Sequence, residues 1–180
     1  MSAQVVALFL NKASRAPLEV VPRVLALAGQ GLEGDRHAKP DARRSVLLMQ
    51  QEVLDEFGLE PGDVREQVTV RGLDLMGLVF GSRLRVGDAV FEVAGPCAPC
   101  ERMNELQPGL REKIDGRRGR FVHVVQQGSF AVGDPVVVET PVTLTERTRG
   151  RSKIRPLREL ARHAALAARL LLRRIFPKLI

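Results

Sequence analysis

Two cysteines lie three residues apart near the middle of the chain, at Cys97 and Cys100, with a proline directly before the second. A thiolate can ligate a metal, attack an electrophile or exchange with a disulfide, so this pair is the first candidate for chemistry. A strand is predicted at 90–93, before the pair, and a short helix at 101–106, after it. This is the local order of a thioredoxin-type site, and it predicts thiol-disulfide exchange as one function of the pair.

Both cysteines could instead be small hydrophobic core residues. This interpretation suits Cys97 better than Cys100, because Pro99 and the charged residues after Cys100 favour an exposed corner. A zinc site requires four ligands, and the two cysteines do not form a recognisable set with the scattered histidines. Those histidines are His37, His123 and His163.

A glycine-rich loop is the second candidate, because residues 29–34 match the GxGxxG pattern after a predicted strand at 24–28. A dinucleotide site requires a helix to start directly after this pattern, with its N-terminus at the phosphates. Here Asp35 would repel a phosphate and Pro40 would interrupt the helix. The sequence therefore favours a sharply bent loop that presents Asp35, Arg36 and His37.

The elements that must position these residues are mainly short strands. Gly-Asp pairs, which form turns, occur four times, and the segment 83–93 has the pattern of a hairpin. Helices are predicted only at 50–57, where Gly58 would end the helix, and at 101–106. We expect an all-β or mainly β fold, a closed β-barrel with a few short helices. The predicted strands are 5–10, 24–28, 46–49, 68–71, 83–86, 90–93, 121–125 and 136–138.

Charge and composition divide the chain of 180 residues into a body and a basic tail. The net charge is +7, yet residues 142–180 carry eleven Lys and Arg against two Glu. We expect one domain at 1–141, a basic linker at 142–155 and an amphipathic helix at 156–180. This helix could pack on the domain or lie on an anionic membrane.

Composition also excludes several classes of protein. Aromatic residues make up 4% of the chain, with no Trp and no Tyr, so stacking platforms for single-stranded nucleic acid are not expected. The N-terminal apolar run, 5–10, is too short for a signal peptide or a membrane span. A disulfide between cysteines this close in sequence would add little stability. We therefore expect a cytoplasmic protein, with peripheral membrane association if the helix at 156–180 binds lipid.

Four segments in order resemble the MOSC domain, the family named after the C-terminal domain of molybdenum cofactor sulfurases. The resemblance extends over roughly residues 5–138 and is strongest where Pro-Cys stands at Cys100. Where the family often has Glu-Asn, this chain has Glu66 and Gln67. The segments are Gly31–His37, Pro61–Leu75, Val86–Asn104 and Gly119–Val125, with a terminal Val132-Gly-Asp-Pro.

The resemblance implies a β-barrel that binds a pterin-molybdenum cofactor, with sulfur- or oxo-transfer chemistry at one cysteine. That residue is Cys100, as a ligand of molybdenum or as the carrier of a persulfide. A high-valent metal is stabilised by a strong thiolate donor, and arginine fits phosphate with its planar guanidinium. The residues that the resemblance assigns to the cofactor are Gly34, Asp35, Arg36, Gln67, Arg71 and Arg102.

Two other functions stay open at this point, a thiol-disulfide oxidoreductase that uses Cys97 and Cys100, and a non-catalytic carrier of the molybdenum cofactor. No pyridoxal phosphate is expected, because the domain that binds it in full sulfurases requires hundreds of further residues. An electron donor or a cofactor-delivery protein is the expected protein partner, and nucleic acid is not expected to bind.

Overall fold

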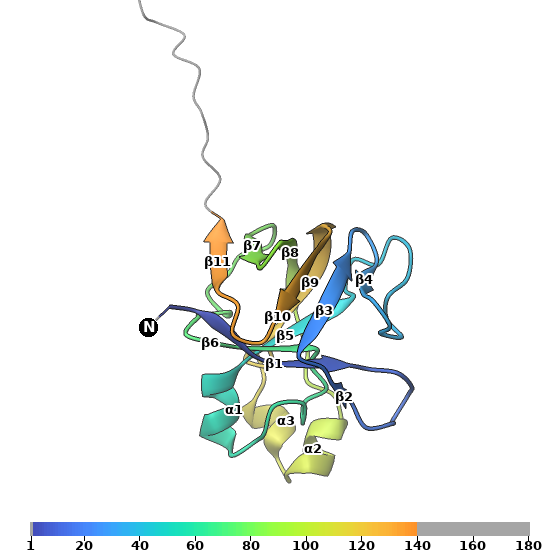
Figure 1. Ribbon diagram of the computed structural model, residues 1–180. Helices are drawn as coiled ribbons and strands as arrows, with labels where there is room; N and C mark the ends of the chain where they lie inside the picture. The colour runs from blue at the N-terminus through green and yellow to red at the C-terminus, as the bar shows by residue number, and fades with distance from the viewer. Residues whose placement is uncertain (1, 140–180) are drawn as a thin grey trace, which may run out of the picture. The chain divides into compact units, whose positions relative to one another are not determined.

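Short apolar segments pair into two β-sheets in the computed structural model, which describes residues 2–139 (Figure 1). The larger sheet has eight strands in the order β11-β7-β8-β9-β5-β6-β1-β2, and the smaller has three in the order β10-β3-β4. The strands are β1 (Gln4–Leu10), β2 (Glu19–Val20), β3 (Arg23–Leu27), β4 (Gly31–Leu32), β5 (Val46–Gln50), β6 (Val68–Arg71), β7 (Arg83–Val86), β8 (Ala89–Pro96), β9 (Arg120–Gln126), β10 (Gly128–Ala131) and β11 (Val136–Glu139).

The mainly β prediction is confirmed, and each of the eight predicted strands is present with ends that shift by up to three residues. The predicted hairpin is β7 and β8, which pair antiparallel from Arg83 with Glu92 to Val86 with Ala89. All pairs in the larger sheet are antiparallel except β5 with β6. The linker predicted at 142–155 and the helix predicted at 156–180 lie outside the described residues.

The prediction of a closed barrel is wrong for residues 2–139. The edge strands of the larger sheet, β11 and β2, do not pair with each other. Between the start of β1 and the residue before β11 there is a single bridge, from Gln4 to Pro135. The backbone N–H of Val5 donates to Asp134 O and that of Val136 donates to Ala3 O on either side of this bridge, and the pairing does not continue as a ladder. β10 pairs with β3 in the separate small sheet, and the large sheet stays open.

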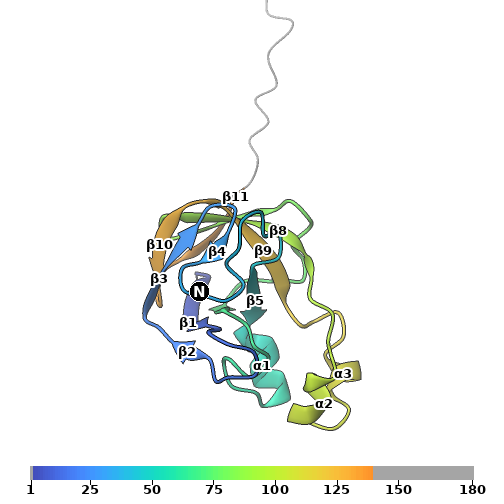
Figure 2. The ribbon, with the colours of Figure 1, turned by 90° about the vertical axis from the view of Figure 1, so that its right-hand side faces the viewer.

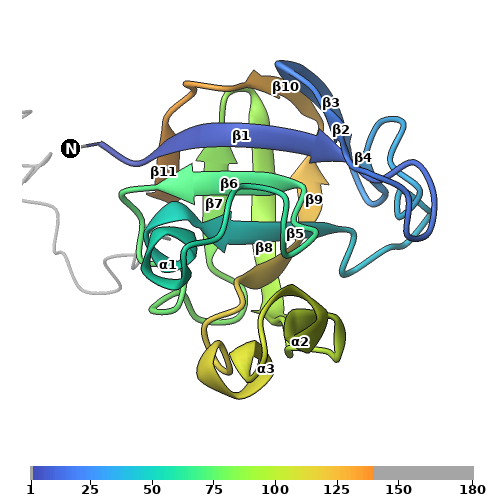
Figure 3. The same cartoon turned by 90° about the horizontal axis from the view of Figure 1, so that it is seen from below.

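Three short helices lie together below the larger sheet in Figure 1 and are seen from their own side in Figure 3. They are α1 (Gln51–Phe57), α2 (Arg102–Leu106) and α3 (Leu110–Lys113). The first two were predicted, and α1 ends as expected at Gly58, whose φ of 63° is left-handed.

The protein has two clusters of buried apolar side chains. The main core fills the space between the two sheets, where Phe91 and Phe130 meet edge to face with ring centroids 5.5 Å apart. A second cluster joins the three helices to the chain before β6, and includes Val64 and Met103. This cluster fixes α2, and with it the chain after Cys100, against the segment that leads into β6. Within residues 2–139 no helix has the length and apolar character that crossing a membrane requires.

Candidate functional site

The glycine-rich loop turns around one buried carboxylate, that of Asp35. Gly34, before it, has a φ of 78°, where a Cβ is strained. The Oδ2 of Asp35 accepts a hydrogen bond of 2.7 Å from the backbone N–H of Asn11, and its Oδ1 accepts one of 2.8 Å from the backbone N–H of His37. The Nδ1 of the His37 ring lies 2.9 Å from the same Oδ1. No helix follows the glycines, so the dinucleotide interpretation is excluded.

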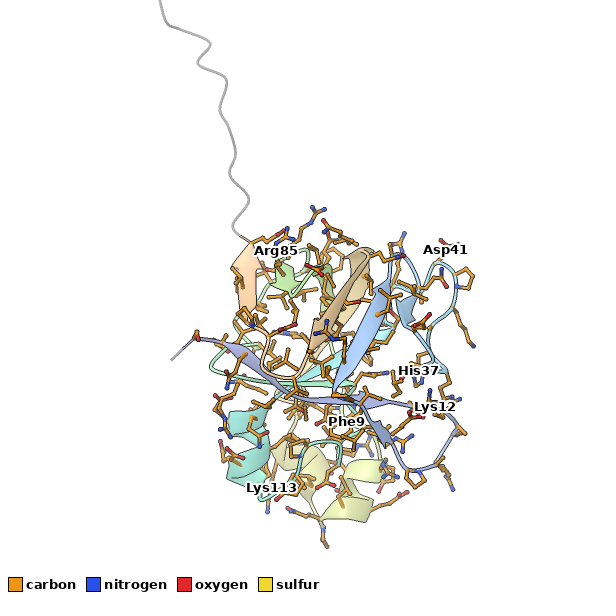
Figure 4. The ribbon with its side chains drawn as sticks, in the orientation of Figure 1. Phe9, Lys12, His37, Asp41, Arg85 and Lys113 are labelled. Atoms are coloured by element: carbon orange, nitrogen blue, oxygen red, sulfur yellow. The ribbon has the colours of Figure 1, made fainter. Side chains whose placement is uncertain are left out.

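Asp35 is held as a carboxylate by these contacts. Burial alone would raise its pKa, but the hydrogen bonds from His37 and Asn11 outweigh burial and hold the pKa below its usual value. The loop is therefore tied to the end of β1 through a charged group rather than through an apolar contact. Figure 4 labels His37 and Lys12, both on the right-hand side of the molecule in that view.

Gln67, at the start of β6, reaches the same carboxylate. Its Oε1 accepts a 2.9 Å hydrogen bond from the backbone N–H of Leu47, which fixes the orientation of the amide. Its Nε2 then lies 3.4 Å from Asp35 Oδ2 and 3.4 Å from His37 Nδ1. The structure thus brings together Gln67 and Asp35, two of the predicted site residues that are 32 positions apart.

Arg65 belongs to this site and was not predicted from the sequence. Its guanidinium donates through Nη2 to Asn11 Oδ1 at 2.8 Å, and through Nη1 to the carbonyl oxygen of Ala16. The carbonyl oxygen of Asn11 in turn accepts a 2.8 Å hydrogen bond from the backbone N–H of Arg36. Asn11 therefore joins Arg36 and Arg65. Arg65 also has a φ of 67°, a left-handed conformation that is uncommon for a non-glycine residue and was not predicted.

The positive charges of the site extend from Arg65 to the helix after Cys100. Burial lowers the pKa of Arg65, and the nearby charges of Arg102 and Arg36 lower it further. Arg102 pairs only loosely with Glu105, at 3.9 Å. Its Nε is buried and has no hydrogen-bond partner among the described residues. The charges of the predicted site residues Arg36 and Arg102 thus both act on Arg65, and the carboxylate of Asp35 opposes them.

The two cysteines have opposite surroundings. Cys97 is buried and Cys100 is exposed, and both are free thiols. The segment from Cys97 to Cys100 belongs to neither a helix nor a strand, and α2 begins only at Arg102. Burial raises the pKa of the Cys97 thiol, while the charge and hydrogen bond of Arg118 oppose that rise. Cys100 is therefore the thiol that a ligand can reach.

Arg118 is a second residue that the sequence did not single out. Arg118 is buried, with 7% of its surface exposed, and its Nη1 donates to the sulfur of Cys97. Its Nη2 donates to the carbonyl oxygen of Val64 at 2.9 Å. Because Val64 directly precedes Arg65, Arg118 connects the cysteine segment with the segment that carries Arg65. Residues 111–120 contain several arginines, and no local pattern indicated that Arg118 would be the buried one.

Arg71 lies elsewhere. It stands at the other end of β6 from Gln67, where its guanidinium is 3.6 Å from the carboxylate of Asp55. It lines a separate surface hollow together with Glu52 and Gly72. The structure does not bring it to Asp35 or Arg65, and we leave it out of the site proposed below.

Glu66 is fully buried beside the site. Its Oε1 accepts hydrogen bonds from the backbone N–H of Gly62 at 2.8 Å and from Thr69 Oγ1 at 2.9 Å. Its Oε2 has no hydrogen-bond partner among residues 2–139. Burial raises the pKa of Glu66 above its usual value of 4.5, because a charged oxygen without a partner is strongly disfavoured there.

The raised pKa of Glu66 predicts that the protein loses stability as the pH rises from 4.5 towards the pKa in the folded state. In that range the unfolded chain has released the proton while the folded chain still binds it, so the free energy of unfolding falls with pH. In Glu66→Gln this fall should be absent. Urea unfolding of both proteins at a series of pH values between about 4 and 8 measures it. Identical slopes in the two proteins would contradict a protonated Glu66.

The donor set of the site suits a ligand with one soft atom and several negative charges. Among the described residues no three His, Cys, Asp or Glu side chains come together as a metal centre. A metal at Cys100 would thus have fewer than three such protein ligands among the described residues and take the others from a bound group. In Figure 2 β4 lies above the helices α2 and α3, which lie at the lower right.

Comparison with protein families gives one match. A family model described as MOSC domain matches residues 35–137 of this chain. The match begins at Asp35 and includes Gln67, Cys100 and Arg118. No curated protein sequence matches the chain.

Solved structures share the fold at low sequence identity. The YUAD protein from Bacillus subtilis is 20% identical, with a TM-score of 0.65 over 76% of this chain and 94% of that one. YiiM from Geobacillus stearothermophilus is 20% identical, with a TM-score of 0.62 over 79% of this chain and 77% of that one. YiiM from Escherichia coli is 19% identical, with a TM-score of 0.58 over 77% and 71% of the two chains.

Proposed function

This chain belongs to the MOSC domain family, and on that premise we propose that it binds the pterin-molybdenum cofactor with Cys100 as the sulfur that serves the metal centre. MOSC domains are associated with the binding of this cofactor. The observation that carries the proposal here is the exposed thiol of Cys100, two residues before Arg102, whose charge acts together with that of Arg36 on Arg65.

The residues present fit such a ligand. The cofactor carries a phosphate and a hydrogen-bonding pterin in addition to its metal, and therefore requires cationic donors close to the thiol. Arg36, Arg65 and Arg102 supply them, and the buried Nε of Arg102 has no partner among residues 2–139. A guanidinium can donate two parallel hydrogen bonds to a phosphate or to an acidic heterocycle. The exposed sulfur supplies the soft donor that a molybdenum centre accepts.

Each residue of the proposed site has a separate task. Cys100 provides the thiolate, which is the form of the thiol that ligates or attacks. Asp35 does not face the ligand, because both of its oxygens are occupied; it holds the loop on which Gly34 and Arg36 lie. Gln67 donates from Nε2 towards Asp35 while its Oε1 accepts from the backbone N–H of Leu47, and we propose that the remaining hydrogen of this amide is donated to the pterin.

When bound, the cofactor supplies a metal that exchanges oxygen or sulfur atoms with a substrate. We propose such sulfur- or oxo-transfer chemistry at Cys100, either as a metal ligand or as a persulfide. A carrier that delivers the cofactor to a partner protein is the alternative without turnover, and a thiol-disulfide oxidoreductase is the alternative that needs both thiols. Turnover separates the carrier from the enzymes, and a requirement for Cys97 separates the two enzymes.

Arg65→Met is expected to weaken cofactor retention by about tenfold or more, since a positioned charge-assisted donor near a metal site has an effect of that size. The matched control is Arg85→Met, which removes an exposed arginine paired with Glu139 on another part of the surface (Figure 4). Cofactor content of both variants, normalised to folded protein by circular dichroism, measures the difference. Equal content in the two variants would remove Arg65 from the site.

The binding proposal is tested on the organic part of the cofactor. The full chain is purified from a host that makes the cofactor, and the pterin is oxidised to its fluorescent form and quantified after denaturation. We expect pterin fluorescence in proportion to protein. Fluorescence no higher than that of an unrelated protein purified in parallel would overturn the proposal.

A further inference from the structure

The sequence favours Cys100 as the exposed thiol, and the structure shows what holds Cys97 in the interior. Cys97 and Cys100 are three residues apart, so a specific contact is needed to keep the first thiol buried while the second is exposed. In the structure the difference follows from Arg118, whose Nη1 contacts the sulfur of Cys97. We propose that Arg118 is the positioning residue that selects the reactive cysteine, because it anchors Cys97 in the interior and so leaves Cys100 alone at the surface.

The contacts of Arg118 reach both ends of the site. Nη1 also lies 3.4 Å from the carbonyl oxygen of Ala98, directly after Cys97, and Nη2 donates to Val64 O at 2.9 Å. The backbone N–H of Cys97 donates to Gly119 O at 3.2 Å, so the residue after Arg118 holds the same cysteine. One side chain and its neighbour thus fix the sulfur and the main chain at the start of the cysteine segment.

The backbone at this point packs closely on β5. Gly119 has a φ of 82°, and a Cβ there would lie 2.1 Å from Leu48 O in β5. Arg118, two residues before β9, thus lies next to a closely packed position, with its guanidinium directed at the cysteine segment. A lysine in its place could reach one of the acceptors but not span Cys97 and Val64 together, since its donors lie on a single nitrogen.

The charge of Arg118 explains why Cys97 is the partner. A guanidinium stays protonated when buried, and buried charges require polar partners. No carboxylate pairs with Arg118 among the described residues, and its acceptors are two carbonyl oxygens and the Cys97 sulfur. Releasing Cys97 to the surface would remove one of these three acceptors. The arginine and the thiol therefore retain each other in the interior.

This inference rests on the proposed function only in naming Cys100 as the working thiol, and its test needs no cofactor. The native full chain is treated with iodoacetamide, and the alkylation of each cysteine is followed by mass spectrometry. In the wild type we expect Cys100 to react at least about tenfold faster than Cys97, because a buried thiol is inert until the chain opens. Comparable rates in the wild type would overturn the inference.

Arg118→Met should bring the two rates close together, and Arg118→Lys should not restore the difference. The matched control is Arg117→Met, which removes the neighbouring arginine and its ion pair with Glu56 at the surface. This control should keep the wild-type ratio. An unchanged ratio in Arg118→Met, or full restoration by Arg118→Lys, would overturn the positioning role.

Loss of global stability alone would produce a different pattern. If Arg118→Met merely unfolds more often, urea unfolding shows the loss, and the alkylation of Cys97 then follows the fraction of unfolded chain. In that case the inference fails. Selection by Arg118 instead predicts rapid alkylation of Cys97 under conditions in which circular dichroism reports a folded protein. Absence of molybdenum from the purified protein would count against the proposed function and leave this outcome unaffected.

Discussion

Cys100→Ala is expected to purify with almost no molybdenum, whereas Cys97→Ala should keep most of the wild-type content. Cys100 is the exposed thiol, two residues before Arg102, and Cys97 is buried against Arg118. Loss of a direct protein ligand of the metal should reduce retention by more than the 10- to 100-fold, roughly, that loss of an outer-shell partner costs. Metal analysis by mass spectrometry, normalised to folded protein, measures both variants against the wild type.

The Cys97 variant is the control that separates two chemistries. A metal or a labile sulfur held by Cys100 alone depends on one thiol, but a redox pair depends on both. Equal loss in the two variants would favour thiol-disulfide exchange between Cys97 and Cys100. Full retention of molybdenum and labile sulfur in Cys100→Ala would contradict the proposal that Cys100 ligates molybdenum or carries a persulfide.

Asp35→Ala is expected to lower the free energy of unfolding by about 3 kcal/mol, the cost of removing one partner from a buried charged network. It leaves the backbone N–H groups of Asn11 and His37 without their acceptor. The loop with Arg36 then loses its attachment to the end of β1, so cofactor retention should fall as well. Urea unfolding compares it with Glu33→Ala, an exposed carboxylate on the same loop without a side-chain partner among the described residues.

The same carboxylate predicts a dependence on pH. Because the pKa of Asp35 is lowered in the folded state, its contribution is complete above the ordinary value of 3.8 and is lost as the pH falls through the folded-state pKa. Asp35→Asn has no such titration. The stability difference between the wild type and Asp35→Asn should therefore shrink below 3.8. A difference that stays constant there would contradict a charged Asp35.

The order of eight of the eleven strands in residues 2–139 was predictable because each of these eight carries its own signal; β2, β4 and β10 were not predicted. Alternating or continuous apolar runs marked β1, β5, β6 and β9, and Gly-Asp turns marked the hairpin of β7 and β8. β2 and β4, with two residues each, are too short for any period to be visible. The prediction of a closed barrel was wrong for a different reason. Closure depends on pairing between strands that are far apart in the sequence, and here an isolated bridge from Gln4 to Pro135 takes the place of a continuous ladder.

The site was only partly predictable for a related reason. Gly34, Asp35, Gln67 and Cys100 lie in segments with recognisable local patterns. Arg65 and Arg118 act through tertiary contacts, with Asn11 in one case and with Cys97 and Val64 in the other.

Burial is what gives these two arginines their role, and no local pattern distinguishes a buried arginine from a surface one. Arg71 is the opposite case, a residue that was predicted for the site but lies outside it. Its segment resembles the family, yet the length of β6 places it at the opposite end from Gln67.

The most direct test of the central claim is the molybdenum content of the full-length wild-type protein from two otherwise identical hosts, one that makes the cofactor and one that cannot. If the chain binds the cofactor through Cys100, protein from the first host should contain molybdenum close to stoichiometry with pterin. Protein from the second host should contain almost none, even with molybdate in the medium. Equal molybdenum in both preparations, or its absence from both, would contradict the account.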